Sequence, residues 1–430
     1  MGKTEKNELL SETVSERRKY KVKTTEEAKK ITLAFLKPIL LDIKSLSLGL
    51  PEIHDRYDNW NVPVLDNSTV IGSVSIDAFS GKINEELSTK LSLFKKRAVT
   101  VNNKQTGKTV KEKFKFIVSN LSNTIVEGKA ENALRNIPEQ SVDLIFTSPP
   151  YYNARKEYSE YESYEEYLDT MRDIIQQCKR VLINGKFFVI NSSHVLVPRA
   201  SRNESSTRIP VPFDLHQIFM DEGFEFVDDI IWQKPEGAGW ASGRGRRFSA
   251  DRNPMQYKAV PVTEYVMVYR KKPAPLIDNF IRKNPNQDIV LKSKIDDDYE
   301  KTNVWYISPA RDKRHPAIFP NELAEKVIKY YSFVNDVVLD PFGGIGTTAK
   351  SAAKLGRRFY SIESSTQYVS ATRSDLEINQ NLLNNNFDYT YLNLTNLPDV
   401  EPKKSLRHTI KELLANGVTS EELIQRLNKD

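Results

Sequence analysis

The sequence contains very little cysteine and histidine and no long apolar run. Its 430 residues include one cysteine and five histidines. A single cysteine excludes an internal disulfide and a cysteine-rich zinc site, and the scattered histidines lack metal-ligand spacing, so no metal is predicted. No run approaches the roughly 20 apolar residues that span a bilayer, so no membrane partner is predicted. Residues 1–20 lack the apolar stretch of a signal peptide, which indicates a cytoplasmic location.

The single cysteine falls on an apolar helical pattern. Apolar and aromatic side chains recur at three- and four-residue steps from Tyr164 to Leu182, which predicts one helix with a buried face. Because Cys178 lies on that face, we expect an inert core thiol rather than a nucleophile.

The overall composition is that of an ordinary folded protein. Hydrophobic residues make up 39% of the chain and charged residues 28%, with a net charge of +6. This charge is compatible with a polyanionic partner but does not require one. The length allows a large core together with one or two accessory modules.

From residue 116 onward, short strand-like runs alternate with helical patterns. This alternation predicts an α/β fold with a doubly wound, mostly parallel sheet. Residues 1–115 predict a small α+β module, a helix plus a meander, with a linker or exposed hairpin over 101–115. The predicted strands of the main domain are Val142–Phe146, Lys186–Asn191, Phe226–Trp232, Tyr265–Tyr269, Val337–Leu339 and Phe359–Ile362.

Two of these strands end abruptly in polar turns, at the edge where a parallel sheet presents its ligand crevice. One turn is Thr147–Tyr151 (TSPPY) and the other is Asp340–Thr348 (DPFGGIGTT). In the second turn, Gly344 and Gly346 permit close approach of the backbone to a ligand. Glu363, about twenty residues further on, matches the acidic residue that binds ribose hydroxyls in nucleotide-type folds. No Gly-Lys-Thr signature is present, so an adenosine-like ligand without phosphates fits better.

Together these motifs resemble those of the amino-group DNA methyltransferases that use S-adenosylmethionine, in the permuted class whose catalytic motif precedes the cofactor motif. The resemblance covers approximately residues 116–375, and residues 340–348 match every fixed position of the family's cofactor motif. It implies a Rossmann-like methyltransferase domain that transfers a methyl group to a base amino nitrogen in double-stranded DNA. The cofactor contacts that it implies are Asp340, Pro341, Phe342, Gly344, Gly346, Thr347, Thr348, Glu363, His315, Pro316, Phe319 and Thr147.

The same resemblance assigns catalysis to Ser148, Pro149, Pro150 and Tyr151. A base amino nitrogen is a poor nucleophile because its lone pair is delocalised into the ring. Accepting its protons on the Ser148 hydroxyl and the Pro149 carbonyl would free the lone pair, without a covalent enzyme intermediate. The Tyr151 ring would stack on the base, which must leave the duplex. In the family, the serine form of this motif is associated mainly with cytosine N4 and the aspartate form mainly with adenine N6.

A glycine-spaced basic and aromatic segment predicts the DNA-reading part of the chain. Arginine can contact phosphates or read guanine, and the resemblance places target recognition between the late strand motif and the cofactor motif. The predicted DNA contacts are Trp240, Arg244, Arg246, Arg247, Lys234 and Arg155.

These predictions divide the chain into five parts. They are an accessory module and linker (1–115), a catalytic half (116–236), a target-recognition region (237–314, interrupted by a core strand at 263–269), a cofactor-binding half (315–400) and a C-terminal helical tail (401–430).

The resemblance also implies a biological setting and leaves alternatives. It implies a restriction–modification system with a cognate restriction endonuclease as functional partner, and an enzyme associated with the nucleoid. Adenine N6 methylation by the same machinery is the nearest alternative. A catalytically inactive DNA-binding or regulatory protein is another, although the intact Ser148, Tyr151, Asp340 and Glu363 argue against it. An RNA or protein-glutamine substrate is the third.

Overall fold

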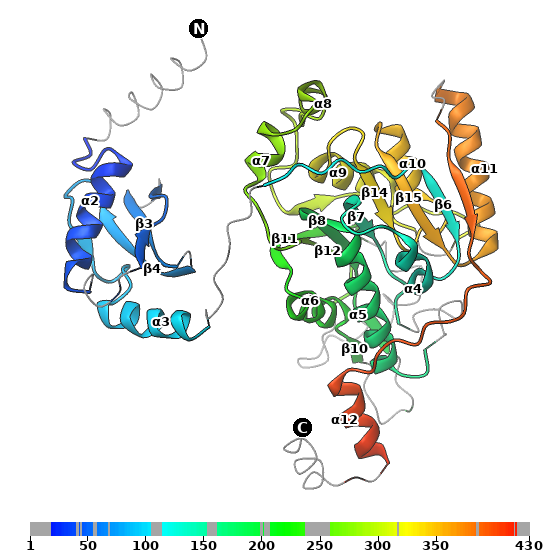
Figure 1. The fold of residues 1–430 in the computed structure, drawn as a ribbon, viewed down its shortest axis with the longest axis horizontal. Coiled ribbons are helices and arrows are strands. Elements are labelled where there is room, and N and C mark those ends of the chain that lie inside the picture. The colour runs from blue at the N-terminus through cyan, green and yellow to red at the C-terminus, as the bar shows by residue number, and fades with distance from the viewer. Residues whose placement is uncertain are drawn as a thin grey trace. The chain divides into compact units, whose positions relative to one another are not determined.

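The computed structural model consists of two compact units that divide between Lys113 and Phe114 (Figure 1). No helix among the residues that it describes is long and apolar enough to cross a membrane. The structure describes residues 19–39, 43, 45–54, 58–67, 69–104, 114–152, 161–197, 201, 207–236, 259–315, 318–383, 387–416 and 418.

The first unit is an antiparallel sheet with two helices packed on it (Figure 1). A capping box between Thr24 and Glu27 starts the first helix. Phe94 of the second helix packs where Gly72 leaves room, since a Cβ at Gly72 would lie 2.6 Å from the Phe94 ring. That helix continues through Lys104, so the prediction of a linker or hairpin is wrong for residues 101–104. The elements are α2 (Thr25–Leu36), η1 (Lys37–Ile39), β1 (Leu46–Leu48), β2 (Glu52–His54), β3 (Asn59–Asp66), β4 (Thr69–Asp77), β5 (Ile83–Asn84) and α3 (Leu91–Lys104).

The second unit is built on a nine-stranded sheet within the described residues. The strand order is β13-β11-β12-β8-β7-β14-β15-β6-β16. Strand β12 is antiparallel to both its neighbours, and the other adjacent pairs are parallel. The predicted mostly parallel α/β sheet is therefore confirmed. The strands are β6 (Thr124–Glu127), β7 (Val142–Thr147), β8 (Leu182–Ser192), β11 (Glu225–Gln233), β12 (Thr263–Arg270), β13 (Val304–Tyr306), β14 (Val337–Asp340), β15 (Arg358–Glu363) and β16 (Thr390–Asn393), with a separate pair β9 (Val195–Val197) and β10 (Thr207–Ile209).

Helices cover both faces of this sheet (Figure 1). Ile190 of β8 belongs to the apolar cluster of one face, and its neighbour Val189 to that of the other, as the two-residue period of a strand requires. The first face carries α4 (Ala130–Ala133), η2 (Leu134–Asn136), α5 (Tyr164–Val181) and α6 (Val211–Asp221), and the second carries α9 (Asn321–Tyr331), α10 (Thr347–Lys354) and α11 (Thr366–Leu383). Two short helices, α7 (Ile277–Arg282) and α8 (Gln287–Lys292), lie in the connection between β12 and β13.

Helix α5 has the buried face that the sequence predicted. Met171, Ile174 and Cys178 are all buried in the cluster under this helix. Burial raises the pKa of the Cys178 thiol, which disfavours the thiolate. The side chain is therefore an apolar core residue.

A buried lysine joins three neighbouring strands at the end of the sheet opposite the two polar turns. Lys186 Nζ lies 3.2 Å from Asp143 Oδ1 and 2.8 Å from Asp336 Oδ2, and its side chain is 5% exposed. The second Asp143 oxygen accepts the Val337 amide at 2.9 Å. This network ties β7, β8 and the start of β14 together.

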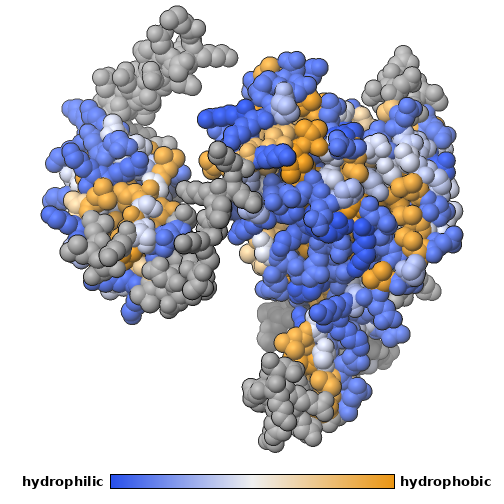
Figure 2. Space-filling view, viewed as in Figure 1, coloured by the Kyte–Doolittle hydropathy of each residue, from blue (hydrophilic) through white to orange (hydrophobic). Residues whose placement is uncertain are grey.

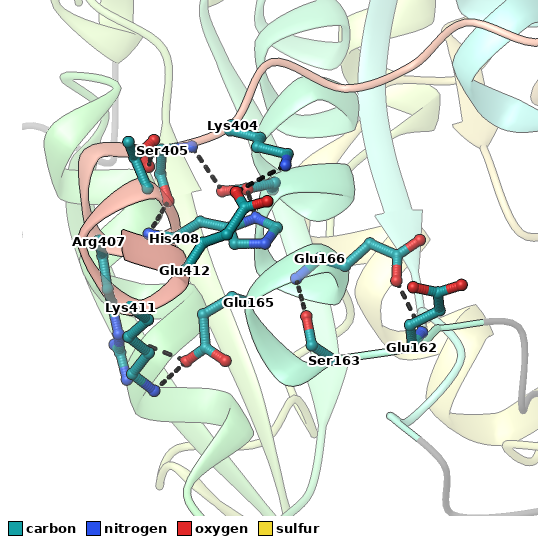
Figure 3. Close-up of polar contacts among 12 residues, drawn as sticks. Glu162, Ser163, Glu165, Glu166, Lys404, Ser405, Arg407, His408, Lys411 and Glu412 are labelled. Atoms are coloured by element: carbon teal, nitrogen blue, oxygen red, sulfur yellow. Dashed lines mark hydrogen bonds and ion pairs between the residues drawn. The ribbon is translucent and has the colours of Figure 1, made fainter. Parts of the chain in front are cut away.

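The C-terminal helix α12 (Leu406–Ala415) lies against α5 through polar contacts (Figure 3). The buried Asp169 accepts the Ser405 amide at 3.1 Å, and its other oxygen lies 2.6 Å from His408 Nδ1. Lys411 forms an ion pair with Glu165. No side chain of α12 is fully buried, and Ile410 and Leu413 are half-buried. Ion pairs and hydrogen bonds thus hold a helix that has no fully buried apolar side chain of its own.

Figure 2 shows a mostly hydrophilic surface on the second unit, interrupted by several separate apolar patches. Leu276, Ile281 and Leu291, in and next to α7 and α8, are exposed.

Candidate functional site

The glycine-containing turn after β14 is organised by a buried aspartate. Asp340 is 1% exposed and accepts three hydrogen bonds. The hydroxyls of Thr147 and Thr348 each donate to it at 2.6 Å, and the Phe342 amide donates at 3.0 Å. Burial raises the pKa of Asp340, although these three donors favour the carboxylate. Pro341, between the aspartate and the Phe342 amide, is also buried.

Two glycines of this turn, Gly343 and Gly346, lie closer to their neighbours than a Cβ atom would permit. A Cβ at Gly343 would lie 2.1 Å from Ser361 Oγ, and one at Gly346 would lie 2.4 Å from Thr372 Cγ2. Gly346 also has a φ of +78° and immediately precedes α10, which begins at Thr347. The sequence therefore needs glycine here for both backbone angle and space.

An acidic side chain and a histidine flank the turn. Glu363, at the end of β15, accepts the amides of Gly344 and Ser365, each at 2.8 Å. Burial raises the pKa of Glu363. On the other side, the ring of His315 lies 4.4 Å from that of Tyr368, and a Cβ at Gly344 would lie 3.4 Å from His315 Nε2. The structure therefore brings Glu363, Gly344 and His315, three of the predicted cofactor contacts, together.

The second polar turn follows β7, the strand next to β14 in the sheet. Thr147 ends β7 and binds Asp340, so the two predicted motifs, 193 residues apart in the chain, are in direct contact. Pro149 is buried, whereas Ser148, Pro150 and Tyr151 are half-buried. The Ser148 hydroxyl oxygen lies 3.4 Å from that of Tyr151.

Two polar residues that the sequence analysis did not select complete this turn. Glu264 of β12 accepts the Tyr151 hydroxyl at 2.9 Å and the Asn191 amide at 2.7 Å. Asn191 Nδ2 also lies 3.4 Å from Ser148 Oγ. Lys234, predicted to contact DNA, forms an ion pair with Glu264. The signal in the sequence was that Asn191 and Glu264 are polar residues at the ends of predicted strands.

Of the predicted site residues not yet mentioned, one lies within the described residues and six do not. Phe319 packs on Phe146, directly before the Thr147–Tyr151 turn, with ring centroids 5.0 Å apart. The others, Pro316, Arg155, Trp240, Arg244, Arg246 and Arg247, lie outside the described residues.

Comparison with known proteins identifies the family. Residues 142–374, which contain both polar turns, match the family model described as DNA methylase. The type II methyltransferase M.BglII of Bacillus subtilis is 31% identical over 259 residues, which cover 57% of this chain and 67% of that protein. The type II methyltransferase M.ScaI of Streptomyces caespitosus is 30% identical over 267 residues, covering 59% of this chain and 81% of that protein.

A solved structure has a similar fold. A protein of Thermus thermophilus, assigned as a DNA modification methylase and complexed with S-adenosyl-L-methionine, matches 64% of this chain and 100% of its own. The TM-score is 0.51 and the sequence identity 27%. The fold and the paired strand-end motifs thus define a methyltransferase-type α/β domain. The chain belongs to the DNA methylase family that contains the N6- and N4-acting enzymes.

Proposed function

We propose that this protein transfers a methyl group from S-adenosylmethionine to the exocyclic N4 of cytosine in a short duplex DNA sequence. The contact between Thr147 and Asp340 carries the proposal, because it places the serine-containing turn directly beside the glycine turn. Two ligands held at the carboxyl ends of adjacent parallel strands lie in one crevice. The Thr147–Tyr151 motif precedes the Asp340–Thr348 motif in the chain, which supports the permuted class that the sequence resembles.

The described residues fit S-adenosylmethionine. The glycine turn, with no Cβ at residues 343, 344 and 346, offers bare backbone at the sheet edge, and nothing in it resembles a phosphate loop. Glu363 would accept hydrogen bonds from the ribose hydroxyls, and His315 would lie on the methionine side. When bound, the cofactor supplies an electrophilic methyl group on a sulfonium sulfur.

The protein's own groups at the catalytic turn would activate the amine by hydrogen bonding. The Ser148 hydroxyl and the Pro149 carbonyl would accept the two amino protons, which favours a pyramidal nitrogen with a localised lone pair. Ser148 is half-buried, and its hydroxyl oxygen accepts a hydrogen bond from the Asn191 side-chain amide. This hydrogen bond fixes the direction of the lone pair that remains free on the Ser148 oxygen. The Tyr151 ring would stack on the flipped base.

The biological setting is part of the proposal. M.BglII and M.ScaI are named type II methyltransferases, which supports a cognate restriction endonuclease and a location at the nucleoid. Lys234 would contact DNA, together with the five predicted DNA contacts outside the described residues.

Methyl transfer to mixed-sequence duplex DNA with labelled S-adenosylmethionine tests this function, followed by mass spectrometry of the nucleosides. N4-methylcytosine is the expected product. N6-methyladenine would retain the mechanism and overturn the target base, and no label in DNA would overturn the proposed function.

Variants of the two serines that flank β7, Ser141 and Ser148, provide a second test. Ser148→Ala should lower methyl transfer and leave cofactor affinity unchanged. Ser141→Ala is the matched control, since this buried serine precedes β7 at its other end and donates to the Pro138 carbonyl at 2.7 Å. Equal rates in the two variants would contradict the role of the Ser148 hydroxyl.

A further inference from the structure

Glu264 joins the catalytic turn to two other strands. Its side chain is 12% exposed. One carboxylate oxygen accepts both the Tyr151 hydroxyl and the Asn191 amide, and the other pairs with Lys234. A half-buried carboxylate with three donors, one of them a cation, is held in a single orientation.

These donors come from separate parts of the sheet. Tyr151 follows β7, Asn191 is near the end of β8, and Lys234 directly follows β11. Sequence separation between Glu264 and Tyr151 is 113 residues, so their contact depends on the complete sheet order. The carboxylate therefore sets the geometry of side chains that three strands bring to one edge.

The same carboxylate lies where the connection 234–262 leaves and rejoins the sheet. The Lys234 amide donates to the Val262 carbonyl at 2.7 Å, and Glu264 is the second residue of β12. Lys234 Nζ also lies 4.6 Å from the centre of the Trp232 ring. This connection contains five of the six predicted DNA contacts, Lys234 among them. Glu264 therefore anchors both the base of this connection and Tyr151.

Tyr151 needs such an anchor to act on a base. Burial and the nearby Glu264 raise the pKa of Tyr151, so the hydroxyl stays protonated and donates to the carboxylate. A tyrosine side chain has two rotatable bonds, and a hydrogen bond at the far end of the ring fixes its plane. A ring whose plane is fixed would hold a stacked base in one orientation relative to Ser148.

We propose that Glu264 is a positioning residue of the methyl-transfer site, which holds Tyr151 and Asn191 around Ser148 and, through Lys234, ties them to the base of the connection 234–262. This inference rests on the proposed function. Glu264 need not contact the base or the cofactor, because it acts through the Tyr151 hydroxyl and the Asn191 amide.

The first test compares two glutamate-to-glutamine variants. Glu264→Gln retains one carbonyl acceptor but loses the charge that pairs with Lys234. Glu222→Gln is the matched control. Glu222 is 15% exposed, pairs with Arg172 at 3.1 Å and accepts the Gln176 side-chain amide at 3.0 Å, and it joins the end of α6 to α5. We expect Glu264→Gln to lower kcat by about 10- to 100-fold. Its affinity for S-adenosylmethionine and its thermal unfolding midpoint should be those of the wild type. Glu222→Gln should keep the wild-type kcat.

A double-mutant cycle then separates positioning from general structure. Tyr151→Phe removes the hydroxyl that Glu264 holds, so adding Glu264→Gln to it should lower kcat less than Glu264→Gln does in the wild type. Full additivity, or equal kcat losses in Glu264→Gln and Glu222→Gln, would overturn the inference. A wild-type kcat in Glu264→Gln would also overturn it while the proposed function stands. Absence of DNA methylation by the wild-type protein would overturn both.

Discussion

Replacement of Gly346 tests whether the glycine turn after β14 depends on the close approach of the Gly346 backbone to Thr372. The left-handed backbone at Gly346, with a φ of +78°, disfavours any residue with a Cβ by about 1–2 kcal/mol. An alanine Cβ would also lie 2.4 Å from Thr372 Cγ2 and 3.1 Å from Thr372 Cβ, and such overpacking costs about 1–3 kcal/mol. We therefore expect Gly346→Ala to lower the free energy of unfolding by about 2–5 kcal/mol.

Gly356→Ala separates the cost of the left-handed backbone from the cost of overpacking. Gly356 has a φ of +70°, but the nearest atom to its added Cβ would be Val334 Cγ1 at 3.6 Å, an ordinary contact. This variant should show only the backbone cost of about 1–2 kcal/mol. Its affinity for S-adenosylmethionine should be unchanged, whereas Gly346→Ala should weaken it.

Urea unfolding, followed by tryptophan fluorescence, measures the free energy of each variant, and calorimetry measures cofactor affinity. Thr372→Ser in the Gly346→Ala background should recover part of the loss. It removes Cγ2 but keeps the hydroxyl that donates to the Gly344 carbonyl at 3.1 Å. Equal unfolding free energies for Gly346→Ala and Gly356→Ala, or no recovery with Thr372→Ser, would refute the packing argument.

Three further outcomes test other parts of the fold and site. Lys186→Met leaves two carboxylates without their cation, so urea unfolding should show a loss of about 3–5 kcal/mol. Thr147→Val removes a donor to the buried Asp340 and should cost about 1.5–3 kcal/mol by the same measurement. Burial raises the pKa of Glu363 above its ordinary 4.5, so its carboxylate is lost at a higher pH than usual. Calorimetry should therefore show S-adenosylmethionine affinity that weakens as pH falls from above 4.5, with a smaller change in Glu363→Gln.

The sequence predicted the core strands because these are buried on both faces. Val142–Thr147 and Val337–Asp340 are each buried along their whole length, and such strands read as continuous apolar runs. The glycine turn was predictable for a related reason, since its polar and glycine residues stop an apolar run. The Thr147–Asp340 contact follows once β7 and β14 are known to be neighbours.

The contacts of Asn191 and Glu264 could not be predicted in the same way. Each is a single polar residue at a strand end, and nothing local in the sequence states which strand lies beside which. Glu264 is on β12, whose antiparallel pairing with β8 brings it to Asn191. Helix α3 was not predicted from the sequence. Its last turn, Val101–Lys104, is rich in asparagine and lysine, residues that also suit a linker.

The strand order places the parts of the site in one row. From β12 through β8, β7 and β14 to β15, the successive side chains are Glu264, Asn191, the Ser148 turn, Asp340 and Glu363. These four spacings of about 4.8 Å make a row about 19 Å long. The base of the connection 234–262 lies at one end, Glu363 at the other, and Ser148 in between. Asp340 binds Thr147 and Glu264 binds Tyr151 and Asn191, so the turn that contains Ser148 is held from both sides. Substitutions of these two residues should therefore lower methyl transfer in different ways. A substitution of Asp340 should weaken cofactor affinity, and a substitution of Glu264 should lower kcat.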